Sequence, residues 1–241
     1  MERSDGRAAD ALRPVRLERG VNPHAEGSCL IDMGETRVLC VASVEEGAPG
    51  WRKGTGLGWI TAEYAMLPRA TSERTRRERQ GPGGRTSEIQ RLIGRSLRAS
   101  VSTFAFGEYT IRIDCDVLQA DGGTRTASIT GGAVALADAC GWLADRIGID
   151  NPFRRLVAAV SVGVVDGTPV LDLPYVEDRD AEVDANIVMG EPDAFIEVQA
   201  TGEHGTFDRA SLDTMLDLAR AGIGELFALQ RRILGWPVDN S

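Results

Sequence analysis

The hydrophobic pattern of this chain changes from strand-like to helix-like in both halves of the sequence, and this order constrains the fold more than any other feature. In the first half, strand patterns precede an apolar, alanine-rich helix predicted from about 127 to 147. In the second half, strand patterns precede an amphipathic helix that carries apolar residues from Leu212 to Phe227. Strands followed by a helix, twice, predict an α+β chain of two similar layers.

Individual elements follow from the same periodicities. We predict strands at 15–19, 27–32, 37–42, 59–67, 111–117, 156–165, 169–173, 187–189 and 195–200. A further helix is predicted to begin at Ser87 as N-cap, with an apolar face of Ile89, Leu92, Ile93 and Leu97. Asp166 and Gly167 are typical of a tight hairpin turn between two strands.

Composition excludes several classes of protein. We find no apolar run near the roughly 20 residues that span a bilayer and no apolar core of a secretory signal near the N-terminus. We therefore expect a cytoplasmic protein with no membrane partner. None of the four cysteines forms a CxxC pair, which argues against a zinc site, and Cys40 and Cys115 lie in apolar runs and are predicted to be reduced core residues.

The charge is distributed unevenly. The chain has a net charge of −9, yet residues 69–98 hold nine arginines and three acidic residues, a balance of +6 that leaves −15 for the rest. One basic segment on an acidic body indicates a localised site for a polyanion. Only Lys53 is a lysine, and the preference for arginine is explained equally well by phosphate pairing and by genomic base composition.

Two glycine turns each precede an arginine and a predicted helix. The first is 122–126 (GGTRT) and the second is 83–87 (GGRTS). Helix N-termini carry unpaired N–H groups and bind anions, so the two turns together suggest a shared phosphate held by two guanidinium groups. The alternative is two plain glycine turns with threonine or serine caps, and the residues alone leave both open.

Two charged stretches are the other candidates. The acidic run 172–184 follows a buried strand and could hold Mg²⁺ through one or two carboxylates and water, or could simply be solvated. Residues 68–84 are predicted to form a long exposed loop, and the arginine loop within it (residues 69–79) could contact phosphates of a nucleic acid. A helical stretch with Arg/Glu pairs is the alternative for 69–79.

With these residues in place, the chain resembles the RNase PH family, also called tRNA nucleotidyltransferases, over nearly its whole length. The most specific matching stretch runs from 114 to 132. The others are 3–7, 24–28, 59–64, 66–69, 84–86, 88–95 and 183–186. Arg179, Asp180 and Ala185 depart from the family pattern and leave the local metal affinity open.

The resemblance implies a ribosomal-protein-S5-domain-2-like α+β fold with an N-terminal sub-domain at 1–150 and a C-terminal one at 151–241. It implies a phosphorolytic 3′→5′ exoribonuclease that trims tRNA precursors with inorganic phosphate, releases nucleoside diphosphates and runs in reverse. It also implies a homohexamer made of three dimers, with no DNA partner.

Site roles come from the same resemblance, residue by residue. Phosphate is expected at Arg85, Gly123, Thr124 and Arg125, and Mg²⁺ or Mn²⁺ at the catalytic aspartates Asp178 and Asp184. RNA is expected at Arg69, Arg74, Arg76, Arg77 and Arg79.

Three rivals share the fold. A non-catalytic RNA-binding ring subunit of an exosome-like assembly would lose the arginine or aspartate set, and both sets are present in this chain. A polynucleotide phosphorylase is longer, with two tandem copies. An archaeal-type exosome subunit would need a different partner chain, so RNA degradation by the single purified chain would exclude it.

Overall fold

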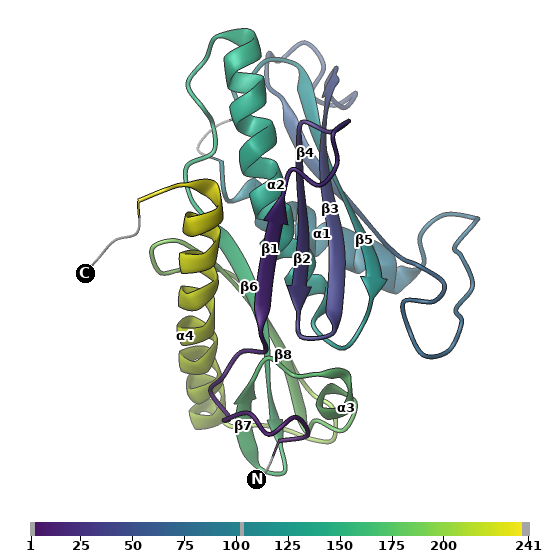
Figure 1. Cartoon of the computed structure of the whole chain (residues 1–241), viewed down its shortest axis with the longest axis vertical. Coiled ribbons are helices and arrows are strands. Elements are labelled where there is room, and N and C mark those ends of the chain that lie inside the picture. The colour runs from purple at the N-terminus through teal and green to yellow at the C-terminus, as the bar shows by residue number, and fades with distance from the viewer. Residues whose placement is uncertain (1–2, 102–103, 238–241) are drawn as a thin grey trace.

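Two β-sheets form the frame of the molecule (Figure 1). The computed structural model describes residues 3–101 and 104–237. The first sheet has the order β1-β2-β3-β5-β4, antiparallel throughout except that β4 runs parallel to β5. Its strands are β1 (Val15–Arg19), β2 (Gly27–Met33), β3 (Thr36–Glu46), β4 (Trp59–Met66) and β5 (Tyr109–Gln119).

The second sheet is antiparallel, with the order β7-β6-β8-β9. Its strands are β6 (Val157–Val165), β7 (Thr168–Leu171), β8 (Val183–Gly190) and β9 (Ala194–Gly202). The β6–β7 turn has positive φ at both Asp166 and Gly167 (47° and 68°), as the predicted hairpin requires. β6 is buried at every position because helices and strands surround it.

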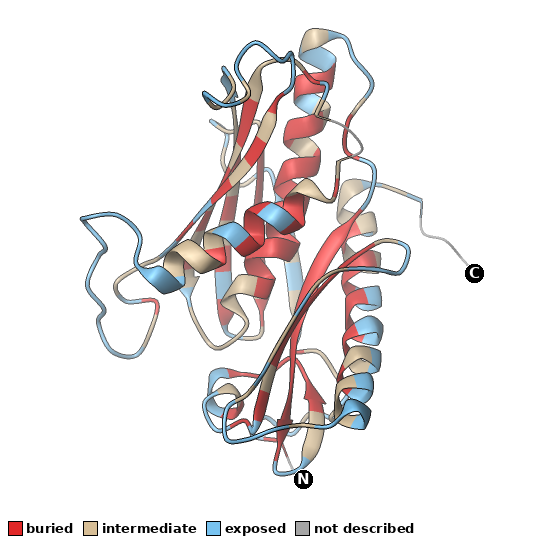
Figure 2. Ribbon diagram, turned by 180° about the vertical axis from the view of Figure 1, so that it is seen from behind, coloured by how far each residue is buried: buried red, intermediate tan, exposed pale blue. Residues whose placement is uncertain are grey.

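The helices fill the space around the sheets. They are α1 (Gly84–Arg98), α2 (Thr124–Ile147), α3 (Tyr175–Asp178) and α4 (Arg209–Leu234). α2 packs against β2 and β3 of one sheet and β6 of the other, while α4 covers β6 and β7. The main hydrophobic core therefore runs through both sheets, and Figure 2 shows α2 as its most completely buried helix.

Helix α2 bears on the prediction that no apolar run in this chain is long enough to span a bilayer. Its most apolar window reaches a mean hydropathy of 1.2, so by length and composition it could cross a membrane. In the fold, 83% of that window is buried against protein, which explains the apolar composition without a bilayer.

Most predicted elements are confirmed, and several of their ends differ from the prediction. The apolar face of α1 is buried as expected, and Cys40 and Cys115 are buried free thiols on paired strands. Ser87 is not the N-cap: α1 begins at Gly84 with Gly83 as its cap, which places Arg85 in the first turn. The acidic run contains the short helix α3, and β8 starts at Val183 rather than near Ile187.

The arginine loop stands away from the body of the protein. Residues 67–83 form neither helix nor strand, and Figure 2 shows this protruding segment mostly in the colour of exposed residues. All five arginines named for RNA contact are exposed. The alternative of a helix with Arg/Glu pairs is therefore wrong for 69–79. A loop of this length without secondary structure is, in a compact protein, typical of a functional segment.

Candidate active site

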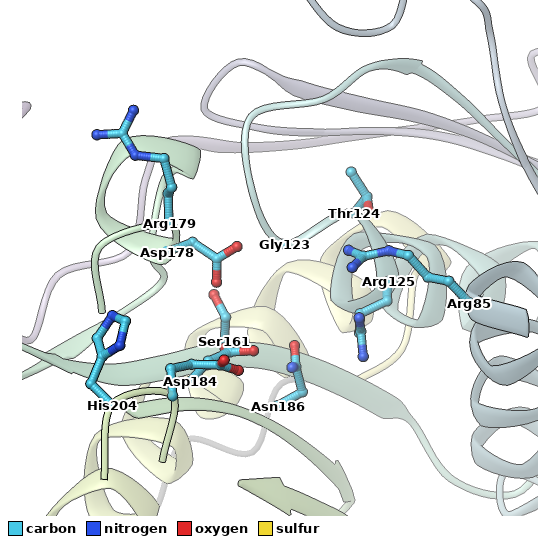
Figure 3. Close-up of a pocket in the computed structure, with 11 residues that line it drawn as sticks. Arg85, Gly123, Thr124, Arg125, Ser161, Asp178, Arg179, Asp184, Asn186 and His204 are labelled. Atoms are coloured by element: carbon cyan, nitrogen blue, oxygen red, sulfur yellow. The ribbon is translucent and has the colours of Figure 1, made fainter. Parts of the chain in front are cut away.

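A polar cavity of about 260 Å³ lies where the first turns of α1 and α2 face α3 and β8 (Figure 3). Arg85, Arg125 and the backbone before α2 lie on one wall, and Asp178 and Asp184 lie on the other, where Arg179 and His204 are also found. The lining residues are Arg85, Gly123, Thr124, Arg125, Ser161, Asp178, Arg179, Asp184, Asn186, Glu203 and His204. All six residues predicted for phosphate and for catalysis line this one cavity.

The turn before α2 exposes backbone donors to the cavity. Gly122 and Gly123 have φ of 74° and 65°, a left-handed conformation that glycine adopts without strain. Gly123 is the N-cap, and no side chain among the described residues caps it. The first N–H groups of a helix have no partner within the helix, so this turn is suited to bind an anion.

The two threonines of the turn do not act as the caps that the plain-turn alternative requires. Thr126 Oγ1 donates to the carbonyl of Gly123 at 2.8 Å, so it stabilises the turn from within. Thr124 Oγ1 lies 2.8 Å from the Tyr64 hydroxyl, a contact that joins the start of α2 to β4. The geometry favours an anion site over a capped turn.

Arg85 and Arg125, which we call the arginine pair, come from the first turns of two different helices. Figure 3 shows their guanidinium groups near each other at the cavity. The Arg125 side chain is 18% exposed, and its Nη1 lies 3.6 Å from Glu88 Oε1. Two forked cations beside free backbone N–H groups can hold one tetrahedral anion from several directions.

Asp178 and Asp184 form the acidic wall. Asp178 is the last residue of α3 and Asp184 is the second residue of β8. Burial raises the pKa of both carboxyls, and burial together with the nearby Asp178 charge raises the pKa of Asp184 to about 6. Asp184 Oδ1 is buried without a hydrogen-bond partner among the described residues. A proton or a cation would relieve this unpaired charge.

The donor set fits a hard divalent cation held partly by water. Among the described residues, no group of three or more His, Cys, Asp or Glu side chains is arranged around a common metal position. Mg²⁺ usually binds one or two carboxylates and keeps several waters. The unpartnered Asp184 oxygen and the facing Asp178 carboxylate match that pattern.

Several lining residues were missed by the sequence reasoning. Ser161, Glu203 and His204 carried no local signal: Ser161 lies within β6, and Glu203 and His204 are in the turn that follows β9. Asn186 did carry one, because residues two apart on a strand share a face and Asn186 follows Asp184 by two. Figure 3 shows its amide between the acidic wall and the arginine pair.

The arginine loop borders the site through a second cavity of about 480 Å³, under the loop and beside α1. Arg76 and Arg77 line this second cavity, and Arg85 lines both. Arg69, Arg74 and Arg79 are exposed and lie outside the linings of these two cavities. A chain of phosphates could therefore run from the loop to the arginine pair.

Comparison with known sequences identifies close relatives. The chain matches the 3′ exoribonuclease family model for domain 1 over residues 11–140 and the model for domain 2 over 155–222. It is 58% identical over 239 residues to ribonuclease PH of Mycobacterium sp. (strain KMS), covering 98% of this chain and 92% of the relative. It is 57% identical to ribonuclease PH of Nocardia farcinica (strain IFM 10152), covering 98% and 93%.

Solved structures share the fold at low sequence identity. The Archaeoglobus fulgidus exosome with RNA bound to the active site has a TM-score of 0.79 at 22% identity, over 97% of this chain and 92% of that one. Rice (Oryza sativa) Rrp46 has a TM-score of 0.77 at 21% identity, over 96% and 100%. These likenesses concern the fold alone.

Proposed function

The chain belongs to the RNase PH family of 3′ exoribonucleases, and on that premise we propose that it shortens the 3′ ends of tRNA precursors by phosphorolysis. Inorganic phosphate is the nucleophile and a nucleoside diphosphate is the product. The product keeps a phosphoanhydride bond, so the reaction also runs backwards and adds nucleotides when diphosphates are plentiful.

The arginine pair and the α2 turn hold the attacking phosphate. Arg85 and Arg125 neutralise its charge, while the N–H groups of Gly123 and Thr124 orient its oxygens. Two anions must meet in this reaction, and fixed donors placed in advance lower the cost of bringing them together. We assign Arg85, Gly123, Thr124 and Arg125 to this role.

The acidic wall acts on the scissile phosphodiester. An orthophosphate oxygen forms a bond to the terminal phosphorus, and the bond from that phosphorus to the 3′-oxygen breaks. The 3′-oxygen then takes a proton from the Asp184 carboxyl when that group is protonated, or from water in the cavity. Asp178 keeps a second negative charge beside Asp184.

Asp178 and Asp184 would hold Mg²⁺ or Mn²⁺ through their carboxylates. When bound, such a cation offsets negative charge on the phosphoryl group. The two carboxylates are thus assigned both the catalytic and the metal-holding role.

RNA reaches the site along the arginine loop. Arg69, Arg74, Arg76, Arg77 and Arg79 are exposed and contribute charge, and Arg76 and Arg77 border the cavity that leads to Arg85. Phosphate contacts of this kind add affinity without reading sequence.

Assembly completes the proposal. We assign residues 1–150 to a sub-domain with the phosphate site and 151–241 to one with the catalytic aspartates, in a cytoplasmic homohexamer of three dimers. β9 is an edge strand with Phe195 and Val198 exposed, a surface that a second copy would cover. The four cysteines are buried and free, which suits a reducing compartment.

The observation that carries the proposal is the convergence of Arg85 and Arg125, from two separate helices, on the cavity that holds Asp178 and Asp184. Phosphate titration of the shortening of a 3′-extended tRNA tests it. We expect the wild type to release nucleoside diphosphate in proportion to bound phosphate. The Arg125→Ala variant should lose its dependence on phosphate far more than its affinity for RNA.

Arg146→Ala is the matched control, because Arg146 lies in the last turn of the same helix, over the Trp142 ring. It should behave as wild type. Equal loss of phosphate use and RNA binding in Arg125→Ala would contradict the assignment of Arg125.

A further inference from the structure

The N-terminal segment places three arginines around one buried residue of the second sheet. Asp172, just after β7, is fully buried and has a positive φ of 55°. Its carbonyl accepts hydrogen bonds from Arg3 Nη2 at 3.1 Å and Arg7 Nη2 at 2.9 Å. Its carboxylate accepts from Arg13, through Nε at 3.0 Å, Nη2 at 2.6 Å and the backbone N–H at 2.8 Å.

Arg13 joins this residue to the phosphate turn. While its fork binds Asp172, Nη1 donates to the carbonyl of Asp121 and Nη2 donates to the carbonyl of Gly122 at 3.4 Å. The Arg13 side chain is 3% exposed and the Asp172 side chain 0%. One buried guanidinium therefore spans the two sub-domains, from the segment that leads into α3 to the turn that opens α2.

The two walls of the cavity also touch directly behind Arg13. A Cβ on Gly122 would lie 2.5 Å from the Leu173 carbonyl oxygen and 2.9 Å from the Tyr175 nitrogen, so any side chain there would force the walls apart. The Tyr175 N–H donates to Asp121 Oδ1 at 3.3 Å. The turn that holds phosphate thus rests on the first residues of the helix that carries Asp178.

Thr36 fixes the same turn from the first sheet. Its hydroxyl donates to the Gly122 carbonyl at 2.6 Å and accepts from the Asp121 N–H at 2.9 Å. The Gly122 carbonyl is therefore held by Thr36 on one side and by Arg13 on the other.

Resting on the proposed function, we propose that Arg13 is a positioning residue for phosphorolysis, which sets the phosphate turn against α3 through its ion pair with Asp172. A buried ion pair is a poor source of stability, since desolvation offsets much of the attraction between its charges. Its geometric effect is specific, because a planar fork fixes direction as well as distance. Arg13 does not line the cavity, and it acts through Gly122 and Asp172.

The test is a kinetic comparison of Arg13→Lys with wild type, in which orthophosphate and RNA are varied separately. Lysine keeps the charge that Asp172 requires but loses the fork that reaches Asp121 and Gly122. We expect the KM for orthophosphate to rise about 10- to 100-fold, because a small displacement of a binding group has effects of this size. The KM for RNA should stay within about twofold, since the arginine loop is untouched.

Arg3→Lys is the matched control. Arg3 is also a buried arginine of the same segment, paired with Glu177 at 2.7 Å, but among its described contacts it makes no bond to the phosphate turn. It should lower the melting temperature without changing the KM for orthophosphate. A merely structural Arg13 would behave in the same way, losing active protein while both KM values stayed unchanged.

A second variant keeps the inference testable if Arg13→Lys fails to fold. Thr36→Val removes two hydrogen bonds from the same turn without leaving a buried charge unpaired, and it should raise the KM for orthophosphate several-fold. An unchanged phosphate KM in Thr36→Val, or in a folded Arg13→Lys, would overturn the inference. A wild type that shortens RNA equally well without phosphate would instead overturn the proposed function.

Discussion

The arginine pair and the arginine loop present the same side chain from different backbones. Arg85 and Arg125 extend from the first turns of two helices; Arg85 is exposed, whereas the Arg125 side chain is 18% exposed and lies beside Glu88. The five arginines of the loop are exposed on a segment without secondary structure. A guanidinium with fixed direction can bind one tetrahedral anion specifically, whereas exposed cations on a loop provide affinity for any polyanion. Under the proposed function, the pair is the site for a small nucleophile and the loop is the surface for a long substrate.

The largest expected contrast comes from paired alanine substitutions. The double variant Arg85→Ala/Arg125→Ala should lower turnover with phosphate by about 10²- to 10³-fold or more, because it removes preorganised positive charge from the reacting anion. Arg76→Ala with Arg77→Ala should leave turnover unchanged at saturating RNA. Initial rates of nucleoside diphosphate release measure both, and similar turnover losses in the two double variants would remove the distinction.

Lysine substitutions sharpen the comparison by keeping the charge. Arg125→Lys should still raise the phosphate KM, by about tenfold, because the bidentate fork is lost. Arg77→Lys should change RNA affinity by less than about twofold, because an exposed phosphate contact needs charge more than direction. Phosphate and RNA titrations of each variant measure the phosphate KM and the RNA affinity. An Arg125→Lys variant with the wild-type phosphate KM would show that charge alone is enough for phosphate binding at the arginine pair.

Salt dependence is the third and smaller contrast. Each phosphate contact removed from a single-stranded nucleic acid should reduce the slope of log affinity against log salt by about 0.7. Arg74→Ala and Arg79→Ala should each reduce the slope for RNA binding in this way. Arg91→Ala is the control, because Arg91 is exposed on α1 outside the loop, and a slope that stays at the wild-type value in the loop variants would argue against RNA contact there.

The last contrast concerns stability on the wall opposite the arginine pair. Burial raises the pKa of Asp184 to about 6 from 3.8, so its ionised form destabilises the fold, and stability is lost as the pH rises through 6. Without added metal, Asp184→Asn should therefore stabilise the protein by about 1–3 kcal/mol at pH 8. The gain should shrink as the pH falls from about 6 towards 4.

Thermal or denaturant unfolding at several pH values measures this gain. Glu73→Gln, in the exposed arginine loop, should give no gain at any pH, because its carboxylate is solvated. Mg²⁺ should stabilise the wild type and not Asp184→Asn, since RT ln(1 + [L]/Kd) is gained only where the ion binds. A pH-independent effect of Asp184→Asn would contradict burial and the Asp178 charge as the origin of the raised pKa.

Much of the fold was predictable because the signals are local. Alternation placed β5, and helical spacing placed the buried face of α1, since each reports which side of one element meets the core. The start of α1 was missed because Gly83 and Gly84 are poor helix formers, so the helix seemed to begin at Ser87. The short α3 was missed because four residues carry no periodicity.

The site was predictable only in part, for a similar reason. Each glycine turn could be recognised from five residues, but nothing local showed that the two turns share a cavity. The pairing of the turns suggested a shared phosphate, but only the resemblance to a family decided against two plain turns and selected Asp178 and Asp184 from the acidic run. Arg13 and Asp172 lie 159 positions apart in the chain, and only the folded structure brings them together.

The central claim is that orthophosphate held by Arg85 and Arg125 attacks the RNA, and the fate of its oxygens tests this most directly. Purified protein would be incubated with a 3′-extended tRNA and orthophosphate labelled with heavy oxygen, and the released nucleotide analysed by mass spectrometry. The account predicts a nucleoside diphosphate whose terminal phosphate carries the label. An unlabelled nucleoside monophosphate, formed equally well without phosphate, would contradict it.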